Sequence, residues 1–265
     1  MQNGPHLPLH LERLSWKQIQ DLQAGGMRML LLPTGATEQH GPHLPVNTDS
    51  VIAGALAAAA SAATGIPVLP VMTYTVSAGH TGKWPGTFSL RHETFLHAVN
   101  DVADWMAATG WNRLLIVNSH FGNDAVLRVA VDQVRLRHLG RLQVGMVNTF
   151  LLSAPVREAF FTDADDLHAN RAETDLMLHL APETVDMSVV EDDPDRTAGT
   201  VFSHPVSQTS LNGVTGRPSE GCALRGAALF RDMVEALTAL ALAGLEELPP
   251  LDPSFWAEVS RLPRI

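Results

Sequence analysis

Hydrophobic positions along the chain recur with two spacings, one typical of helices and one typical of strands. Apolar residues at helical spacing predict helices over 16–23, 50–63, 92–109, 124–139 and 223–245. Short apolar runs predict strands over 27–32, 66–70, 113–117 and 142–148. The run at 114–117 has no polar position, as expected of a strand buried on both faces. Because helices and strands alternate, we expect an α/β fold whose mostly parallel sheet has helices on both faces.

Polar side chains gather where two of these predicted strands end. Glu38 and His40 follow the strand at 27–32, Asp49 comes shortly after them, and His120 follows the strand at 113–117. Ligands of parallel α/β sheets collect at the carboxyl ends of the strands. Carboxylates and imidazoles together are the donors of a divalent-metal site, so the sequence predicts a metal centre at this edge.

A third polar segment lies further along the chain, with His168 followed by Glu173. If 173–180 is helical, its apolar residues face the core and His168 is presented at the loop end. Each group alone also has an ordinary explanation, such as a solvated loop side chain, a capping histidine, or a strand-to-helix turn with Asn123 or Asp124 as N-cap. The recurrence of several such groups favours the metal site.

Composition narrows the class of protein. The length of 265 residues, without a Pro/Gly/Ser-rich linker, predicts a single domain over 1–265. A net charge of −10 with 18 Lys+Arg argues against nucleic acid and anionic membranes as partners and favours a small molecule. Cys222 is the single cysteine, so the metal ligands must be His, Asp and Glu. The N-terminus has no signal-peptide pattern and the apolar run at 51–63 is too short to span a bilayer, which predicts a cytoplasmic protein.

Several segments together resemble the creatininase (creatinine amidohydrolase) family. In the family's order they are TGATEQHGPHLP at 34–45, NTD at 47–49, WPGT at 84–87, NSHFGN at 118–123 and HANRAET at 168–174. The first signature, with the Thr-Asp that follows it, is the most specific. The resemblance covers roughly residues 10–245 and implies a three-layer αβα sandwich, a two-metal centre, hydrolysis of C–N bonds other than ordinary peptide bonds, and assembly into homohexamers.

Carried over residue by residue, the resemblance implies metal-ligand positions at Glu38, His40, Asp49, His120 and Glu173, with Asp49 as the bridging carboxylate. It also implies a substrate pocket lined by His80, Trp84 and Phe121. Two divalent ions are expected, zinc first, with manganese or iron as alternatives. Creatininase has a glutamate two residues after its counterpart of His120, where this chain, like many other family members, has Gly122, and this difference argues against creatinine as the substrate.

The chemistry follows from these residue types. Water between two divalent ions loses a proton near neutral pH, and the resulting metal-bound hydroxide can attack a carbonyl carbon. The poor amine leaving group then needs a proton, which an imidazole with an ordinary pKa of about 6.5 can carry. We therefore expect His168 to be the catalytic acid/base of a metal-dependent amidohydrolase that acts on a small cyclic amide or formamide.

Other functions remain open at the level of sequence. Relatives within the family resemble a mycofactocin-type peptidase that trims a modified precursor peptide, or deformylases of pyrimidine intermediates. A non-catalytic metal-binding member is a further alternative, although the complete set of polar groups argues against it. Ser119 beside His120 suggests a serine nucleophile, but the chain has no Gly-x-Ser-x-Gly elbow. The chain has no glycine-rich phosphate-binding motif, which argues against a nucleotide-binding protein.

Overall fold

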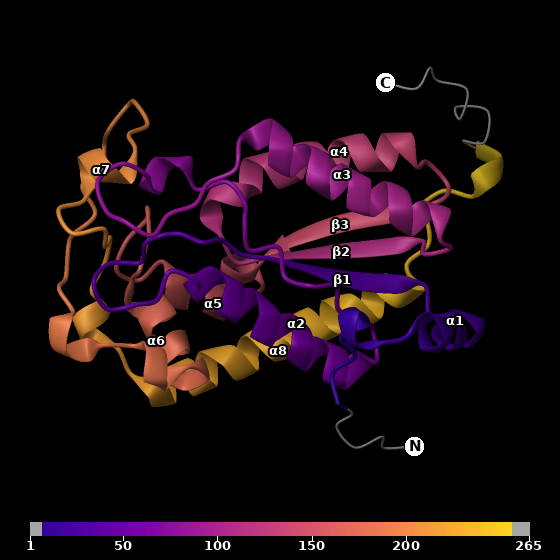
Figure 1. Ribbon diagram of the computed structural model, residues 1–265, viewed down its shortest axis with the longest axis horizontal. Coiled ribbons are helices and arrows are strands. Elements are labelled where there is room, and N and C mark those ends of the chain that lie inside the picture. The colour runs from indigo at the N-terminus through magenta and orange to yellow at the C-terminus, as the bar shows by residue number, and fades with distance from the viewer. Residues whose placement is uncertain (1–6, 256–265) are drawn as a thin grey trace.

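The centre of the fold is a parallel three-stranded sheet. The computed structural model describes residues 7–255, and its strands are β1 (Met29–Thr34), β2 (Arg113–Asn118) and β3 (Gln143–Asn148), in the order β1-β2-β3. The register places Thr34, Asn118 and Asn148 side by side at the carboxyl ends. Loops that leave these three ends therefore start from one edge of the sheet (Figure 1).

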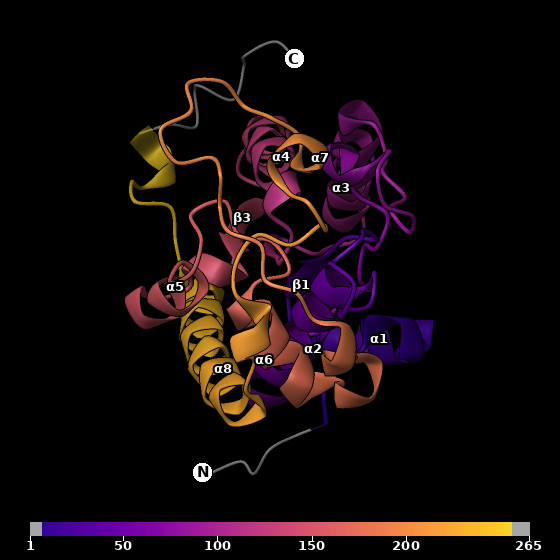
Figure 2. The same ribbon diagram turned by 90° about the vertical axis from the view of Figure 1, so that its left-hand side faces the viewer.

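Helices cover both faces of this sheet. In chain order they are α1 (Trp16–Ala24), α2 (Thr48–Thr64), α3 (His92–Ala108), α4 (Asp124–Arg137), α5 (Ala154–Phe160), α6 (Arg171–Leu180), α7 (Val206–Thr209) and α8 (Ala223–Glu246). The pair α3 and α4 lies on one face, whereas α2, α6 and α8 lie on the other (Figures 1 and 2). This arrangement confirms the predicted αβα sandwich with a parallel sheet.

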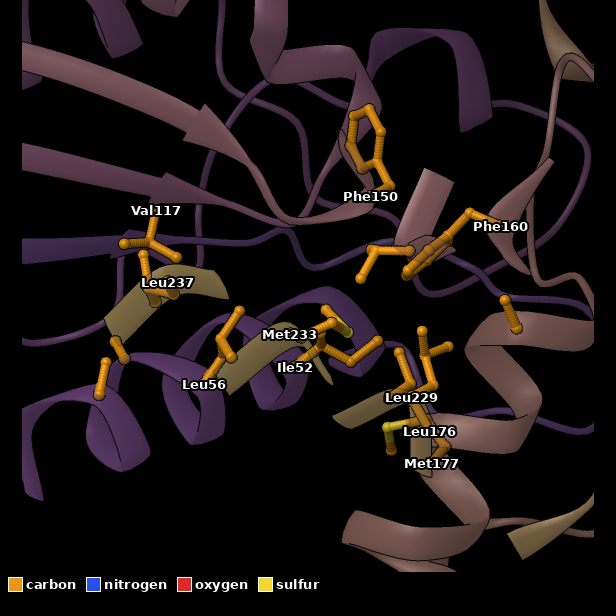
Figure 3. Packing of buried hydrophobic residues seen from close by; sticks show 14 of the residues in the cluster. Ile52, Leu56, Val117, Phe150, Phe160, Leu176, Met177, Leu229, Met233 and Leu237 are labelled. Carbon is orange, nitrogen blue, oxygen red and sulfur yellow. The ribbon is translucent and has the colours of Figure 1, made fainter. Parts of the chain in front are cut away.

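Strand side chains alternate between two hydrophobic clusters. Leu31 of β1 packs with Val117 toward α2 and α8, whereas Leu30 and Ile116 pack toward α3 and α4. Figure 3 shows the first cluster, in which Val117 faces the apolar stripe of α8. Full burial of each such side chain contributes about 1.5–3 kcal/mol. The run without polar positions in β2 is thus buried on both faces, as predicted.

The predicted strand at 66–70 does not form. Its central residue, Val68, makes isolated parallel bridges to Leu31 and His10, and the segment stays extended beside β1. Pro67 and Pro70 flank this residue and have no N–H to donate, so a regular ladder cannot extend in either direction. The other predicted strands and helices form with each end within about two residues of its predicted place.

Residues 181–222, between α6 and α8, run over the carboxyl edge of the sheet with little regular structure. They contain the short 3₁₀ turns Pro182–Thr184, Met187–Val189 and Pro218–Glu220 and the single-turn helix α7. Similar 3₁₀ turns are Leu11–Arg13, Ala78–His80, Phe121–Asn123, Thr149–Leu151 and Pro253–Phe255. Within residues 7–255, no helix has both the length and the apolarity needed to cross a membrane.

Candidate metal centre

A tight turn after β1 brings the first three predicted ligands together. A Cβ at Gly35 would lie 2.4 Å from the backbone nitrogen of Ser50, so only glycine allows the loop to approach the start of α2 this closely. Asp49 lies in that first turn of α2. As a result, one ligand atom each from Glu38, His40 and Asp49 lies within 4.8 Å of the others.

The turn after β2 presents His120 to the same place. Asn118, at the end of β2, accepts a hydrogen bond from the Thr34 hydroxyl (3.0 Å) and donates to Asn148 Oδ1 (2.8 Å) and to the backbone carbonyl of His120 (2.7 Å). These buried bonds tie the three strand ends together and fix the turn. The ring of His120 then lies with Nδ1 3.2 Å from Glu38 Oε1 and 3.2 Å from an oxygen of Asp49.

Glu173 reaches the site from the start of α6. The helix begins at Arg171, two residues before the predicted start, and Glu173 completes a capping box with Asn170. The preceding residue, Ala169, has a left-handed backbone with φ of 48°, a conformation that costs energy for a residue with a Cβ. This kink allows His168 to turn inward, so that ligand atoms of His40, His168 and Glu173 also lie within 4.8 Å of one another.

Backbone carbonyls set the tautomers of two imidazoles. The Nδ1–H of His40 donates to the carbonyl of Glu38 (3.1 Å), and the Nε2–H of His120 donates to the carbonyl of Val76 (2.8 Å). The lone pairs on His40 Nε2 and His120 Nδ1 therefore face the site. His40 Nε2 lies 3.4 Å from Asp49 Oδ1, and His120 Nδ1 lies 3.2 Å from Asp49 Oδ2. The two oxygens of Asp49 face different histidines, as a bridging carboxylate requires.

The donor set fits divalent cations. Both side-chain oxygens of Glu38, Nε2 of His40 and Oδ2 of Asp49 are buried and have no hydrogen-bond partner among the described residues. Buried polar atoms are normally satisfied by hydrogen bonds, so a cluster of unpartnered acceptors facing one another is the signature of a cation site.

Electrostatics lead to the same conclusion. Burial disfavours the Asp49 carboxylate, but His40 and His120 outweigh it and lower the pKa of Asp49 to about 2. Burial likewise disfavours the His40 imidazolium, yet Asp49, Glu173 and Glu38 raise the pKa of His40 to about 10. Burial raises the pKa of Glu173 to about 7. Without a metal, protons on His40 and Glu173 thus offset the buried negative charge, at positions where metal cations would replace them.

A cavity of about 250 Å³ opens onto this cluster. Its apolar wall includes Val76, Phe121, Phe150 and Val206. The half-exposed ring of Phe121 stacks on Phe150 with the centroids 5.6 Å apart. His80 lines the same cavity, with Nε2 3.8 Å from Glu38 Oε2. Two of the three predicted pocket residues, His80 and Phe121, therefore lie where they could contact a substrate.

Trp84 lies outside this cavity. Its ring lines a separate surface groove with Pro42 and Leu211. Two contacts of Lys83 hold Trp84 in this position. The Lys83 ammonium group lies 4.5 Å above the Trp84 ring and donates a hydrogen bond to the carbonyl of Ser210 (2.8 Å). These contacts hold the 83–84 turn against the loop at 210–212, away from the acidic cluster.

Several residues of the site were missed by the sequence analysis, among them Gln39 and Asp166. Gln39 is 96% buried behind the cavity, with its amide against His80 and His168. Asp166 lines the cavity. The position of Gln39 between two predicted ligands was a usable signal, whereas nothing in the local pattern around Asp166 indicated its place.

A parallel α/β sandwich with a carboxylate–histidine cluster at its strand ends is the arrangement of a metal-binding α/β protein. The family model described as creatinine amidohydrolase matches residues 12–241. The chain therefore belongs to the creatininase family and is a hydrolase of that family.

Individual relatives support this membership. The chain is 28% identical over 257 residues to the creatinine amidohydrolase of Pseudomonas putida, which covers 89% of this chain and 96% of that protein. It is 34% identical over 219 residues to the mycofactocin precursor peptide peptidase of Mycolicibacterium smegmatis, covering 78% of this chain and 81% of the relative. A mutant creatininase of zinc–zinc type superposes with a TM-score of 0.79 at 25% identity over 91% of this chain and 99% of its own. A manganese creatininase has the same TM-score of 0.79.

Proposed function

We propose that this protein is a binuclear metal-dependent amidohydrolase that cleaves a C–N bond in a small cyclic amide or formamide. The observation that carries this proposal is the set of buried, unpartnered acceptor atoms on Glu38, His40 and Asp49. Membership of the creatininase family and the zinc and manganese forms of its solved relatives are consistent with it.

We assign the ligands to two adjacent positions that share Asp49. Glu38 and His120 would complete the first position, because His120 Nδ1 lies 3.2 Å from both carboxylates. His40 and Glu173 would complete the second, on the side of Asp49 Oδ1. Zinc is the first candidate for both positions, with manganese or iron as alternatives.

His168 is the proposed acid/base. Burial, together with the neighbouring His80 and His40, lowers the pKa of His168 well below its ordinary value, so the imidazole is neutral and can accept a proton. Its Nδ1 faces Glu38 Oε1 at 3.6 Å, on the side of the proposed metals. When bound, divalent ions would supply Lewis acidity and lower the pKa of water. His168 would take the proton of the attacking water and pass it to the leaving nitrogen.

The cavity favours a small substrate, and the residue at position 122 argues against creatinine. Its volume of about 250 Å³ lies below the usual range of about 300–1,000 Å³ for drug-sized ligands. At the position where creatininase has a glutamate, a Cβ on Gly122 would lie 2.6 Å from the His120 ring and 2.8 Å from the Val76 carbonyl. The local backbone therefore leaves no room for that glutamate. Lactams, cyclic ureas and formamides are the compounds to screen.

A peptidase that trims a modified precursor peptide is the second candidate. The identity of 34% to a mycofactocin precursor peptide peptidase favours it. The same cluster could cleave near the end of a peptide whose last residues enter the cavity. Cleavage of such a peptide without turnover of lactams or formamides would select this function.

Metal analysis of purified variants tests the proposal. We expect close to two divalent ions per chain in the wild type and a clear fall in Asp49→Asn, because loss of a bridging carboxylate weakens both positions. His168→Ala should keep its metal while kcat falls by about 10²–10⁴, the usual contribution of a positioned acid/base. Asp101→Asn, on the exposed face of α3, is the matched control and should change neither quantity.

Three results would contradict the assignments. Unchanged metal content in Asp49→Asn would exclude a bridging role. Loss of metal in His168→Ala would make His168 a ligand instead of a proton carrier. A wild-type protein that binds no zinc, manganese or iron after reconstitution would favour a non-catalytic member of the family.

A further inference from the structure

The side-chain amide of Gln39 is held in one orientation behind the cavity. Its Oε1 accepts from the backbone N–H of Gly41 (3.0 Å), and its Nε2 lies 3.2 Å from the carbonyl of Gly213. A flipped amide would place a donor against the Gly41 N–H and an acceptor against the Gly213 carbonyl. Gly213 is required for this contact, because a Cβ there would lie 2.1 Å from Gln39 Oε1.

The same amide nitrogen lies close to two imidazoles, but it can donate to only one of them. His168 Nε2 lies 3.0 Å from Gln39 Nε2 and 2.7 Å from the backbone carbonyl of Gln39. A carbonyl only accepts, so His168 Nε2 carries a hydrogen and cannot accept from the amide. The remaining partner of the amide is Nδ1 of His80, at 3.2 Å, which must be the acceptor.

Both histidines are therefore Nε2–H tautomers, but they present different ring nitrogens to the cavity. His80 carries its proton on Nε2, which faces Glu38 Oε2 at 3.8 Å. His168 presents the unprotonated Nδ1, which faces Glu38 Oε1 at 3.6 Å. The ring centroids of His80 and His168 are 4.1 Å apart. The Nε2–H donor of His80 and the Nδ1 acceptor of His168 therefore lie side by side next to the Glu38 carboxylate.

We propose that Gln39 is a positioning residue that makes His80 a hydrogen-bond donor to the substrate carbonyl and His168 the proton acceptor of the reaction. This inference rests on the proposed amidohydrolase function. Water oxygen bonds to the carbonyl carbon while its proton passes to His168 Nδ1, and the Nε2–H of His80 donates to the oxygen that becomes negative. The C–N bond then breaks as the same proton passes from His168 to the leaving nitrogen.

His80 is not a metal ligand in this scheme. Ligand atoms of Glu38, His80 and His168 lie within 4.8 Å of one another, so distance alone would allow a metal between them. A protonated Nε2 has no lone pair to offer a cation, and the bond from Gln39 keeps the proton there. His80 is a catalytic residue in this scheme, whereas Gln39 acts only through it and through His168.

Nitrogen-15 NMR of the imidazoles tests the tautomers without any need for turnover. In both metal-free and zinc-loaded wild-type protein, we expect His80 to be protonated at Nε2 and His168 at Nε2. In Gln39→Glu the amide donor becomes an acceptor, so the proton of His80 should move to Nδ1. Gln20→Glu, on the exposed surface of α1, adds the same charge and should leave both tautomers unchanged.

Kinetics of His80 variants give a second test that does not depend on the folding of Gln39→Glu. His80→Leu should lower kcat by about 10²–10³ with metal content unchanged, the usual effect of losing one oxyanion donor. His80→Gln places an amide N–H near the former Nε2 and should recover part of that loss.

Three outcomes would overturn the inference. One is a wild-type His80 protonated at Nδ1, another is a His80 bound to zinc through Nε2, and the third is wild-type kcat in His80→Leu. A wild type that binds no metal and hydrolyses no amide would instead reject the proposed function, and the substrate contact with it. The NMR measurement distinguishes these failures because it identifies the protonated nitrogen of each imidazole without any need for turnover.

Discussion

At the scale of single residues, Gly122 controls the orientation of His120. A Cβ at this position would come within 2.8 Å of the Val76 carbonyl and within 2.6 Å of the His120 nitrogen that donates to it. We predict that Gly122→Ala displaces the imidazole, lowers metal content toward one ion per chain, and destabilises the protein by about 1–3 kcal/mol, as overpacking does.

Elemental analysis and urea denaturation would measure both effects. Gly145→Ala is a suitable control, because its nearest neighbour would be a Leu115 methyl group at an ordinary 3.7 Å. Wild-type metal content in Gly122→Ala would show that His120 tolerates a side chain here.

The side chain of His43 also supports the site, through a hydrogen bond to α6. Its Nε2–H donates to the Thr174 hydroxyl (2.9 Å), which itself donates to the carbonyl of Asn170 (2.8 Å). This bond ties the loop after β1 to α6 and its Glu173. His43 thus belongs to the scaffold of the centre, and it lies outside the residues that line the cavity.

The buried imidazole predicts a pH dependence of stability. Burial, together with nearby His40, lowers the pKa of His43 from 6.5 to about 4. Between these values the unfolded chain binds a proton that the folded protein does not, so the free energy of unfolding falls as pH decreases through this window. The full loss is about 3 kcal/mol, at 1.36 kcal/mol per pKa unit.

A glutamine keeps the donor to Thr174 but cannot titrate. Urea denaturation of metal-free protein between pH 6.5 and 4 should therefore show a smaller loss of stability in His43→Gln than in the wild type. Metal-free protein is needed so that release of cations at low pH does not add to the slope. Identical slopes would show that other groups cause the pH dependence.

At the scale of elements, the contact between α6 and α8 positions Glu173. A Cβ on Gly226 of α8 would lie 1.8 Å from the carbonyl oxygen of Asp175 in α6, so the two backbones touch at this point. Arg225 clamps the same place through a two-pronged ion pair with the buried Asp175 carboxylate. The position of α8 therefore determines the distance between α6 and the sheet, and with it the position of Glu173.

We predict that Gly226→Ala separates these helices and lowers the free energy of unfolding by about 3 kcal/mol. Gly244→Ala, further along α8, meets only the Met29 side chain at 3.5 Å and should be neutral or stabilise the helix by up to about 1 kcal/mol. Thermal denaturation of the pair would measure the difference. Equal stability of the two variants would mean that α8 can shift without cost.

The elements also show what the sequence could and could not predict. Apolar runs located β1 and β2 because a strand buried on both faces has a distinctive composition. An apolar run also located β3, although most of its residues are only partly buried. The same rule failed at 66–70, where Pro67 and Pro70 remove the donors that a ladder needs. Three of the proposed ligands, Glu38, His40 and His120, could be placed at this edge from the sequence because they follow strand ends. The place of Trp84 could not, since it depends on how a long loop packs against residues 210–212.

At the scale of the whole molecule, the site is closed by a segment that is distant in sequence. His168 pairs with Thr215 through two backbone hydrogen bonds, of 3.2 and 2.7 Å, and Gly216 pairs in turn with Asp193. The irregular chain between α6 and α8, which Figure 2 shows running over this end of the molecule, thus holds the loop that carries His168. The single domain, the homohexamer and the cytoplasmic location remain predictions from the sequence.

Metal binding should stabilise the whole molecule. Three buried carboxylates, on Glu38, Asp49 and Glu173, converge on one cluster, and without cations their burial must be offset by protons on neighbouring groups. A ligand present at 1,000 times its dissociation constant stabilises the folded state by about 4 kcal/mol. For a chain of this length, we predict that a chelator lowers the midpoint of thermal unfolding by about 10 °C.

Differential scanning calorimetry before and after chelation would measure this shift, and added zinc should reverse it. Asp49→Asn provides the decisive comparison, since a variant with weakened metal positions should show little response to the chelator. If the wild type and Asp49→Asn lost the same stability, the chelator would be acting elsewhere on the protein. A shift confined to the wild type would instead tie the stability of the entire sandwich to the cluster at its strand ends.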